Sequence, residues 1–193
     1  MKLAAAAAIA AGIGCMAGSA AVLALRALPP PQESFGQKFE PVWSDAAWPF
    51  PQDQWNAGRA FVCQPADCGE RVDVFLRPKI GFCNCSTGVS DDAELERVSD
   101  TALLSRDVAP VGSGRPIKVA WMDGRSRTYR SASGSNLLSV AFNDECDAVV
   151  AVARLENVDS AVIEPAVLKL LNTRPVVLWT KTELGLEFVK REW

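Results

Sequence analysis

The chain has 193 residues, of which 49% are hydrophobic and 22% are charged, and its formal net charge is −3. This composition is ordinary for a globular protein, and the weak negative charge argues against a nucleic-acid partner, which selects a concentrated basic surface. The sequence has no histidine, the usual general base and metal ligand. We therefore expect no metal site, no cofactor and no Ser-His or Cys-His catalytic pair. An enzyme is the less favoured class, although a hydrolase that uses two carboxylates needs no histidine.

Residues 1–26 are expected to be a signal peptide or a transmembrane anchor. Lys2 precedes an uncharged apolar run at 3–25, and Arg26 ends it. The length favours an anchor, because about 20 residues span a bilayer, whereas the high alanine content favours a cleaved signal. Both alternatives place the rest of the chain in the cell envelope, either anchored in the inner membrane and facing the periplasm or secreted to the periplasm. An uncleaved run at 3–25 would be the contact with the membrane.

Residues 27–58 are predicted to form an arm rich in proline and tryptophan. Prolines interrupt its aromatic residues, so we expect neither a helical nor a strand period. The aromatic residues are Trp43, Trp48, Phe50 and Trp55. We expect these rings to pack on the following domain. A membrane-interface belt and a binding platform for sugars or peptides are the alternatives.

Residues 59–193 are predicted to form one α+β domain, and its first half begins with a hairpin. Residues 59–63 and 72–77 have strand patterns and are joined by a short turn that contains Pro65 and Gly69. Pro78 indicates a bend or an edge position. Asp91, followed by Glu94, is typical of a helix N-terminus, and an apolar stripe continues to about Leu104. The acidic residues in the first turn of this helix are expected to be solvated. A cation-binding site is the alternative.

Five cysteines lie outside the apolar run and are candidates for disulfides: Cys63, Cys68, Cys83, Cys85 and Cys146. Cys83 and Cys85 point to the same face of an extended segment and can hardly bond each other. Each is therefore expected to bond a distant partner, and Cys63, Cys68 and Cys146 are the candidates. We favour a bond from the first hairpin to Cys83 or Cys85, with one cysteine left unpaired or bonded to a second chain. Zinc or Cu(I) binding and thiol exchange are the alternatives.

The stretch Arg77-Pro78-Lys79-x-Gly81-Phe82-Cys83-Asn84-Cys85 resembles a motif in a group of exported bacterial proteins of unknown function. The resemblance would cover most of residues 59–182. It implies export, but it carries no activity, ligand or site residue to this chain.

The second half predicts more hairpins and a covering helix. Residues 117–122 and 125–130 alternate around a turn at Asp123-Gly124, and 137–142 and 146–155 are joined at Asn143-Asp144. A helix is expected from Pro165 to residue 171, and a last strand over 175–182. The fold class is therefore α+β: a largely antiparallel, disulfide-linked sheet with two helices on one side, preceded by an N-terminal apolar helix.

Four basic residues of the predicted hairpin at 117–130 form a candidate face for an anionic ligand: Lys118, Arg125, Arg127 and Arg130. A solvated surface is the simpler interpretation. The sequence as a whole predicts an exported or membrane-anchored, non-catalytic envelope domain that binds a partner protein, a glycan or the membrane surface. The alternative is a redox or Cu(I)-handling protein that uses the thiols of Cys83 and Cys85.

Overall fold

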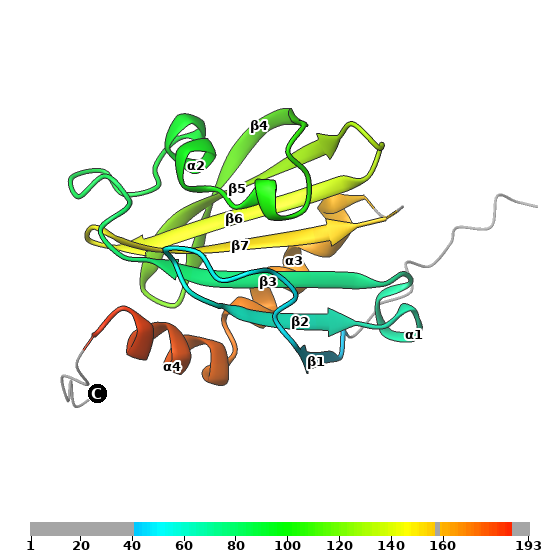
Figure 1. Ribbon diagram of the computed structural model, residues 1–193, viewed down its shortest axis with the longest axis horizontal. Coiled ribbons are helices and arrows are strands. Elements are labelled where there is room, and N and C mark those ends of the chain that lie inside the picture. Colours follow the sequence, from blue (N-terminus) through cyan, green and yellow to red (C-terminus); the bar gives the residue numbers. More distant parts are fainter. Residues whose placement is uncertain (1–40, 157–158, 187–193) are drawn as a thin grey trace, which may run out of the picture. The chain divides into compact units, whose positions relative to one another are not determined.

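The computed structural model describes residues 41–156 and 159–186 (Figure 1). Seven strands form one sheet in the order β1-β2-β3-β7-β6-β5-β4, and every neighbouring pair is antiparallel. The strands are β1 (Trp43–Ala46), β2 (Arg59–Cys63), β3 (Val72–Lys79), β4 (Val108–Val119), β5 (Met122–Ser131), β6 (Asn136–Asp144) and β7 (Asp147–Leu155). The helices are α1 (Pro65–Cys68), α2 (Asp92–Val98), the 3₁₀ turn η1 (Thr101–Leu103), α3 (Ser160–Leu171) and α4 (Arg174–Glu183).

The predicted α+β class, with an antiparallel sheet and disulfides, is confirmed. The described residues contain four α-helices rather than two. The predicted leader at 1–26, its apolar helix and the start of the arm lie outside the described residues.

The first predicted hairpin is confirmed as β2 and β3, which pair from Arg59↔Leu76 to Cys63↔Val72. The short helix α1 lies in the connection, and Gly69 closes it with a φ of 76°, a value that glycine adopts without strain. Pro78 lies within β3, opposite Val149 of β7. The pairing of β2 with β3 ends at Leu76, so no strand lies beside Pro78 on the β2 side. This agrees with the predicted edge position of Pro78.

Both turns predicted in the second half are displaced along the chain, the first by three residues and the second by two. The β4–β5 turn is at residues 120–121, where Ala120 has a φ of 52°, and Asp123-Gly124 lies inside β5. A Cβ on Gly124 would meet the Ala141 carbonyl oxygen at 2.2 Å, so this glycine serves a close approach between strands rather than a turn. The β6–β7 turn is at 145–146 rather than at Asn143-Asp144, and Glu145 has a φ of 50°.

The predicted strand at 175–182 is wrong, because these residues form helix α4. Pro175 occupies the first turn of α4, where its missing N–H costs nothing. Helix α3 begins earlier than predicted, at Ser160, and the Asp159 carboxylate caps it by accepting from the Ala161 amide at 2.9 Å. Pro165 is therefore inside α3 rather than at its start.

Helices cover both faces of the sheet, which corrects the expectation that they lie on one side. Figure 1 shows α3 behind the strands, where α3 and α4 pack on the larger core. The opposite face carries α2, through Leu95 and Val98. It also carries Trp48 and Phe50 of the predicted arm, which pack on Phe75 with ring centroids 6.1 and 4.9 Å away.

The arm is more ordered than its prolines suggested, because Trp43–Ala46 forms β1 and pairs with β2. Asp91 caps α2 as predicted, accepting from the Glu94 amide at 2.8 Å. The helix ends at Val98, well before Leu104, and Asp100, two residues later, contacts Arg77 and Lys79 of β3.

Candidate functional site

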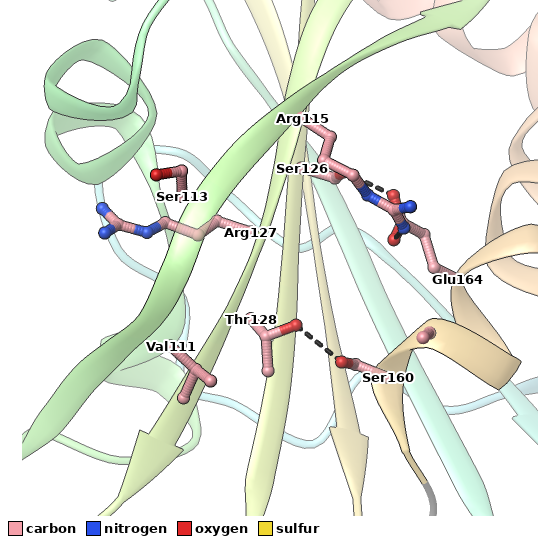
Figure 2. Close-up of a pocket in the computed structure, with 9 residues that line it drawn as sticks. Val111, Ser113, Arg115, Ser126, Arg127, Thr128, Ser160 and Glu164 are labelled. Atoms are coloured by element: carbon pink, nitrogen blue, oxygen red, sulfur yellow. Dashed lines mark hydrogen bonds and ion pairs between the residues drawn. The ribbon is translucent and has the colours of Figure 1, made fainter.

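A pocket of about 220 Å³ lies between α3 and the β4–β5 hairpin (Figure 2). Its lining comes from three elements and is rich in hydroxyl groups. The lining residues are Val111, Ser113 and Arg115 of β4, Ser126, Arg127 and Thr128 of β5, and Ser160, Ala161 and Glu164 of α3. The pocket is smaller than the 300–1,000 Å³ of typical small-molecule sites, so it suits a small molecule or one unit of a larger one.

Glu164 is the acidic residue of the pocket lining and is only 5% exposed. One carboxylate oxygen accepts from the Ser126 hydroxyl at 2.5 Å, and the other forms an ion pair with the Arg115 guanidinium. Ser126 is buried, whereas the Arg115 side chain is 62% exposed. The buried carboxylate is therefore satisfied by one hydroxyl and by one cation that still faces the solvent.

A second polar contact lies beside this pair. The Thr128 hydroxyl donates to the Ser160 hydroxyl oxygen at 2.7 Å, as the dashed line in Figure 2 shows. Thr128 and Ser126 alternate with Arg127 along β5, so they share the face of the sheet that α3 covers. Figure 2 shows the Arg127 side chain directed away from Glu164 and Thr128, although Arg127 also borders the pocket.

The β4 side of the pocket is a bulge, because the pairing of β4 with β5 shifts register between Val111 and Arg115. Bulges redirect side chains and occur often at functional sites. The Asp92 carboxylate holds this one by accepting from the Gly114 amide at 3.0 and 3.1 Å. This hydrogen bond and the bond from Arg125 lower the pKa of Asp92. Helix α2 thus fixes the strand segment that carries Ser113 and Arg115.

The four predicted basic residues do not form one free cationic surface. Arg125 pairs with Asp92, and Arg127 pairs with Glu96 at 2.6 Å and with Asp92 at 3.5 Å. These two acidic side chains belong to α2, and both are ion-paired, while the Glu96 side chain also stays 48% exposed to solvent. Lys118 pairs with Asp123 at 3.1 Å, and Arg130 donates to the Asn136 side chain at 3.4 Å. Arg130 also lies on the opposite face of β5 from Arg125 and Arg127, by strand alternation.

The cysteines form two disulfides, Cys63–Cys68 and Cys85–Cys146. The expected bond from the first hairpin to the Cys-x-Cys pair is wrong, because both partners of the first bond lie in the hairpin and its connection. The prediction that one of the five stays unpaired is confirmed, and the unpaired residue is Cys83.

Cys83 is buried, and its thiol donates to the Glu145 carbonyl at 3.2 Å. Desolvation, together with the charges of Glu94 and Asp147, raises its pKa to about 11. Because the thiolate is the nucleophile and the metal ligand, only about one thiol in 10⁴ is reactive at pH 7. This environment is that of a structural cysteine.

The Arg-Pro-Lys residues of the motif lie in a buried ion network that the sequence did not reveal. Asp100 accepts from Arg77 at 2.7 and 2.9 Å and from Lys79 at 2.8 Å. Arg77 also donates to Asp53 at 2.7 Å, and Lys79 donates to the Val98 carbonyl at 2.7 Å. Desolvation lowers the pKa of Lys79, while the charge of Asp100 opposes that effect. Every charged group of the network therefore has a partner. The contact with Asp53 links the arm to β3, and the contact with the Val98 carbonyl links α2 to β3.

The described part of the chain contains neither a candidate metal site nor a candidate membrane-spanning helix. Its residues contain no group of three or more Cys, Asp or Glu residues that could hold a metal ion. No helix of residues 41–156 and 159–186 is long and apolar enough to cross a membrane. The chain matches no protein-family model, and a search of curated proteins finds no relative.

Proposed function

We propose that this chain is an exported or membrane-anchored, non-catalytic domain of the cell envelope, and that it binds an envelope partner through the pocket beside α3. The observation that carries the proposal is the state of the cysteines. Four of the five in the described residues are paired, and disulfides persist in oxidising compartments rather than in the cytosol. The apolar run at 3–25, which we interpret as part of a signal peptide or an anchor, and the motif around Cys83 agree with this proposal.

The thiol alternative has less support. It requires Cys83 and Cys85 to act as a pair, but Cys85 is bonded to Cys146. Cys83 is buried and has a raised pKa, which disfavours both disulfide exchange and Cu(I) binding through a thiolate.

The pocket favours binding over hydrolysis. A carboxylate mechanism needs two acidic groups on either side of the scissile bond, and Glu164 is the single carboxylate among the lining residues of this pocket. The Ser126 hydroxyl touches that carboxylate, but Ser126 is only 1% exposed, so a substrate cannot reach it as a nucleophile.

The test is a cysteine map of the chain expressed with its own leader and recovered from the bacterial periplasm and membranes. Without reductant, alkylation followed by peptide mass spectrometry should label Cys83 only after unfolding and should leave the four bonded cysteines unlabelled. A Cys83→Ser variant is the matched control, because it should lose this label and keep both disulfides. Labelling of Cys83 and Cys85 in the native protein, or stoichiometric Cu(I) that Cys83→Ser abolishes, would overturn the proposal.

A further inference from the structure

We infer that the pocket beside α3 binds one neutral sugar unit of an envelope glycan; this inference rests on the proposed function and names its ligand class. Three features of the molecule support this ligand class: the charge of the pocket, its hydrogen-bonding capacity, and the form of the neighbouring sheet edge.

The charges that border the pocket are balanced by the protein itself. Arg115 and Glu164 neutralise each other, and Arg127 is paired with Glu96 and Asp92 of α2. An anion that bound Arg115 would have to lie beside the buried Glu164 carboxylate, and a cation that bound Glu164 would have to displace Arg115. Like-charge proximity and the loss of a buried partner both carry a cost, so the pocket favours a neutral ligand.

The pocket offers donors and acceptors together. Arg115 has five N–H donors, and only one of its nitrogens donates to Glu164, so donors remain on an exposed side chain. The Thr128 oxygen donates to Ser160 and keeps its lone pairs.

Sugar hydroxyls fit this mixed set, because each hydroxyl both donates and accepts. Val111, which is 43% exposed, and Ala161 add an apolar surface for the C–H groups of the ring. The lining contains no aromatic ring, and we therefore expect weak binding, with a Kd on the order of 1 mM.

The edge of the sheet argues against a peptide strand as the ligand. Strand β4 is the edge beside the pocket, and it contains Pro110 and Pro116. Prolines lack the N–H that a pairing strand requires and occur on edges with that side facing solvent. The bulge between Val111 and Arg115 interrupts the same edge. Both features protect edge strands from added strands.

The experiment measures binding of glucose, galactose, mannose and N-acetylglucosamine to the full chain by saturation-transfer NMR, with inorganic phosphate as a charged probe. At least one sugar should bind saturably near 1 mM, and phosphate should bind more weakly. Arg115→Gln and Thr128→Val should each weaken sugar binding about tenfold, while the matched control Lys118→Gln should not change it. Circular dichroism checks that each variant is folded.

Three results would overturn the inference: no saturable sugar binding up to about 50 mM, well above the expected Kd; sugar binding that both pocket variants retain; or phosphate binding that is tighter and lost in Arg115→Gln. None of these results depends on the cysteine map. A protein with the expected disulfides and no sugar binding would refute the ligand class alone, whereas a native Cys83/Cys85 thiol pair would refute the proposed function.

Discussion

Asp100→Ala tests whether the ion network under β3 is a buried structural element. Arg77 and Lys79 are only 3% and 4% exposed, and Asp100 accepts hydrogen bonds from both. Removing Asp100 leaves two buried cations with Asp53 as the remaining carboxylate, and the Asp53 side chain is 44% exposed. Breaking a buried ion pair in this way costs about 3–5 kcal/mol, a large part of the roughly 5–15 kcal/mol of stability of a typical domain.

The assay is urea unfolding followed by tryptophan fluorescence at pH 7 without reductant, with ΔG extrapolated linearly to water. Asp123→Ala is the matched control, because it also removes an aspartate from a lysine pair, but Lys118 and Asp123 are 61% and 84% exposed. Exposed pairs contribute only about 0–1 kcal/mol, so the two variants should differ several-fold. Equal losses in the two variants would refute the assignment of a buried network.

A triple variant distinguishes two causes of the stability loss in Asp100→Ala: the lost attraction to Asp100, and the cost of leaving Arg77 and Lys79 buried without that partner. Replacing Arg77 and Lys79 with Met and Asp100 with Leu removes all three charges together. Apolar replacements of whole buried ion clusters are often neutral or stabilising, so this variant should recover most of the stability that Asp100→Ala loses. If the triple variant is as unstable as the single one, uncompensated charge is not the cause of the loss.

Three further outcomes are expected for stability. Replacing Cys85 and Cys146 with Ala opens a loop of 61-residue separation and should cost about 4 kcal/mol in the chain-entropy model, against about 2 kcal/mol for the shorter disulfide; equal urea midpoint shifts would contradict this. Gly124→Ala should cost about 1–3 kcal/mol, because its Cβ would meet the backbone of Ala141; an unchanged unfolding temperature would contradict it. The pKa of Asp92 is lower in the folded state, so its contribution is full above its unfolded pKa of about 3.9 and is lost as the pH falls through the folded value. An Asp92→Asn variant should therefore lose less stability than wild type between about pH 4 and pH 2, and parallel acid unfolding curves would count against it.

Local patterns in the sequence were sufficient where local interactions decide the structure. The Asp91 cap of α2 depends on a residue three positions away, and the β2–β3 hairpin joins two consecutive strands that each have a clear local pattern. Both were predicted correctly. Asp123-Gly124 has the same local form as a hairpin turn. The structure places Gly124 in a strand because β6 approaches its backbone closely, and that constraint comes from a residue distant in the sequence.

Helix α4 shows how composition misleads. Valines next to each other, as at Val176-Val177, favour a strand on propensity alone. The buried residues Val176 and Thr180 are four apart, which is the helical period. Together with Pro175 in the first turn, this spacing was the available evidence for a helix.

The candidate site was not predictable because its groups converge across long sequence separations. Ser126 and Glu164 are 38 residues apart, and Glu164 is a single acidic residue without a motif. Its partner Arg115 is one of several arginines in the same region. Arg115 lies opposite Ser126, on the face that α3 covers, whereas Arg125 and Arg127 point to the other face, by strand alternation. The position of α3 on the sheet, and not any local pattern, brings these groups together.

The basic residues explain why recognition should be confined to the pocket. Arg125 and Arg127 were candidates for an anionic ligand, but their partners are the acidic residues of α2. The same contacts hold the Gly114 bulge through Asp92, and the bulge sets the position of Arg115. Arg125 and Arg127 therefore help to shape the pocket rather than to bind a ligand. Arg115 is the pocket cation that combines an exposed side chain with a buried carboxylate partner. A ligand that enters this pocket must satisfy that pair without separating it, and this requirement selects for hydroxyl groups over full charges.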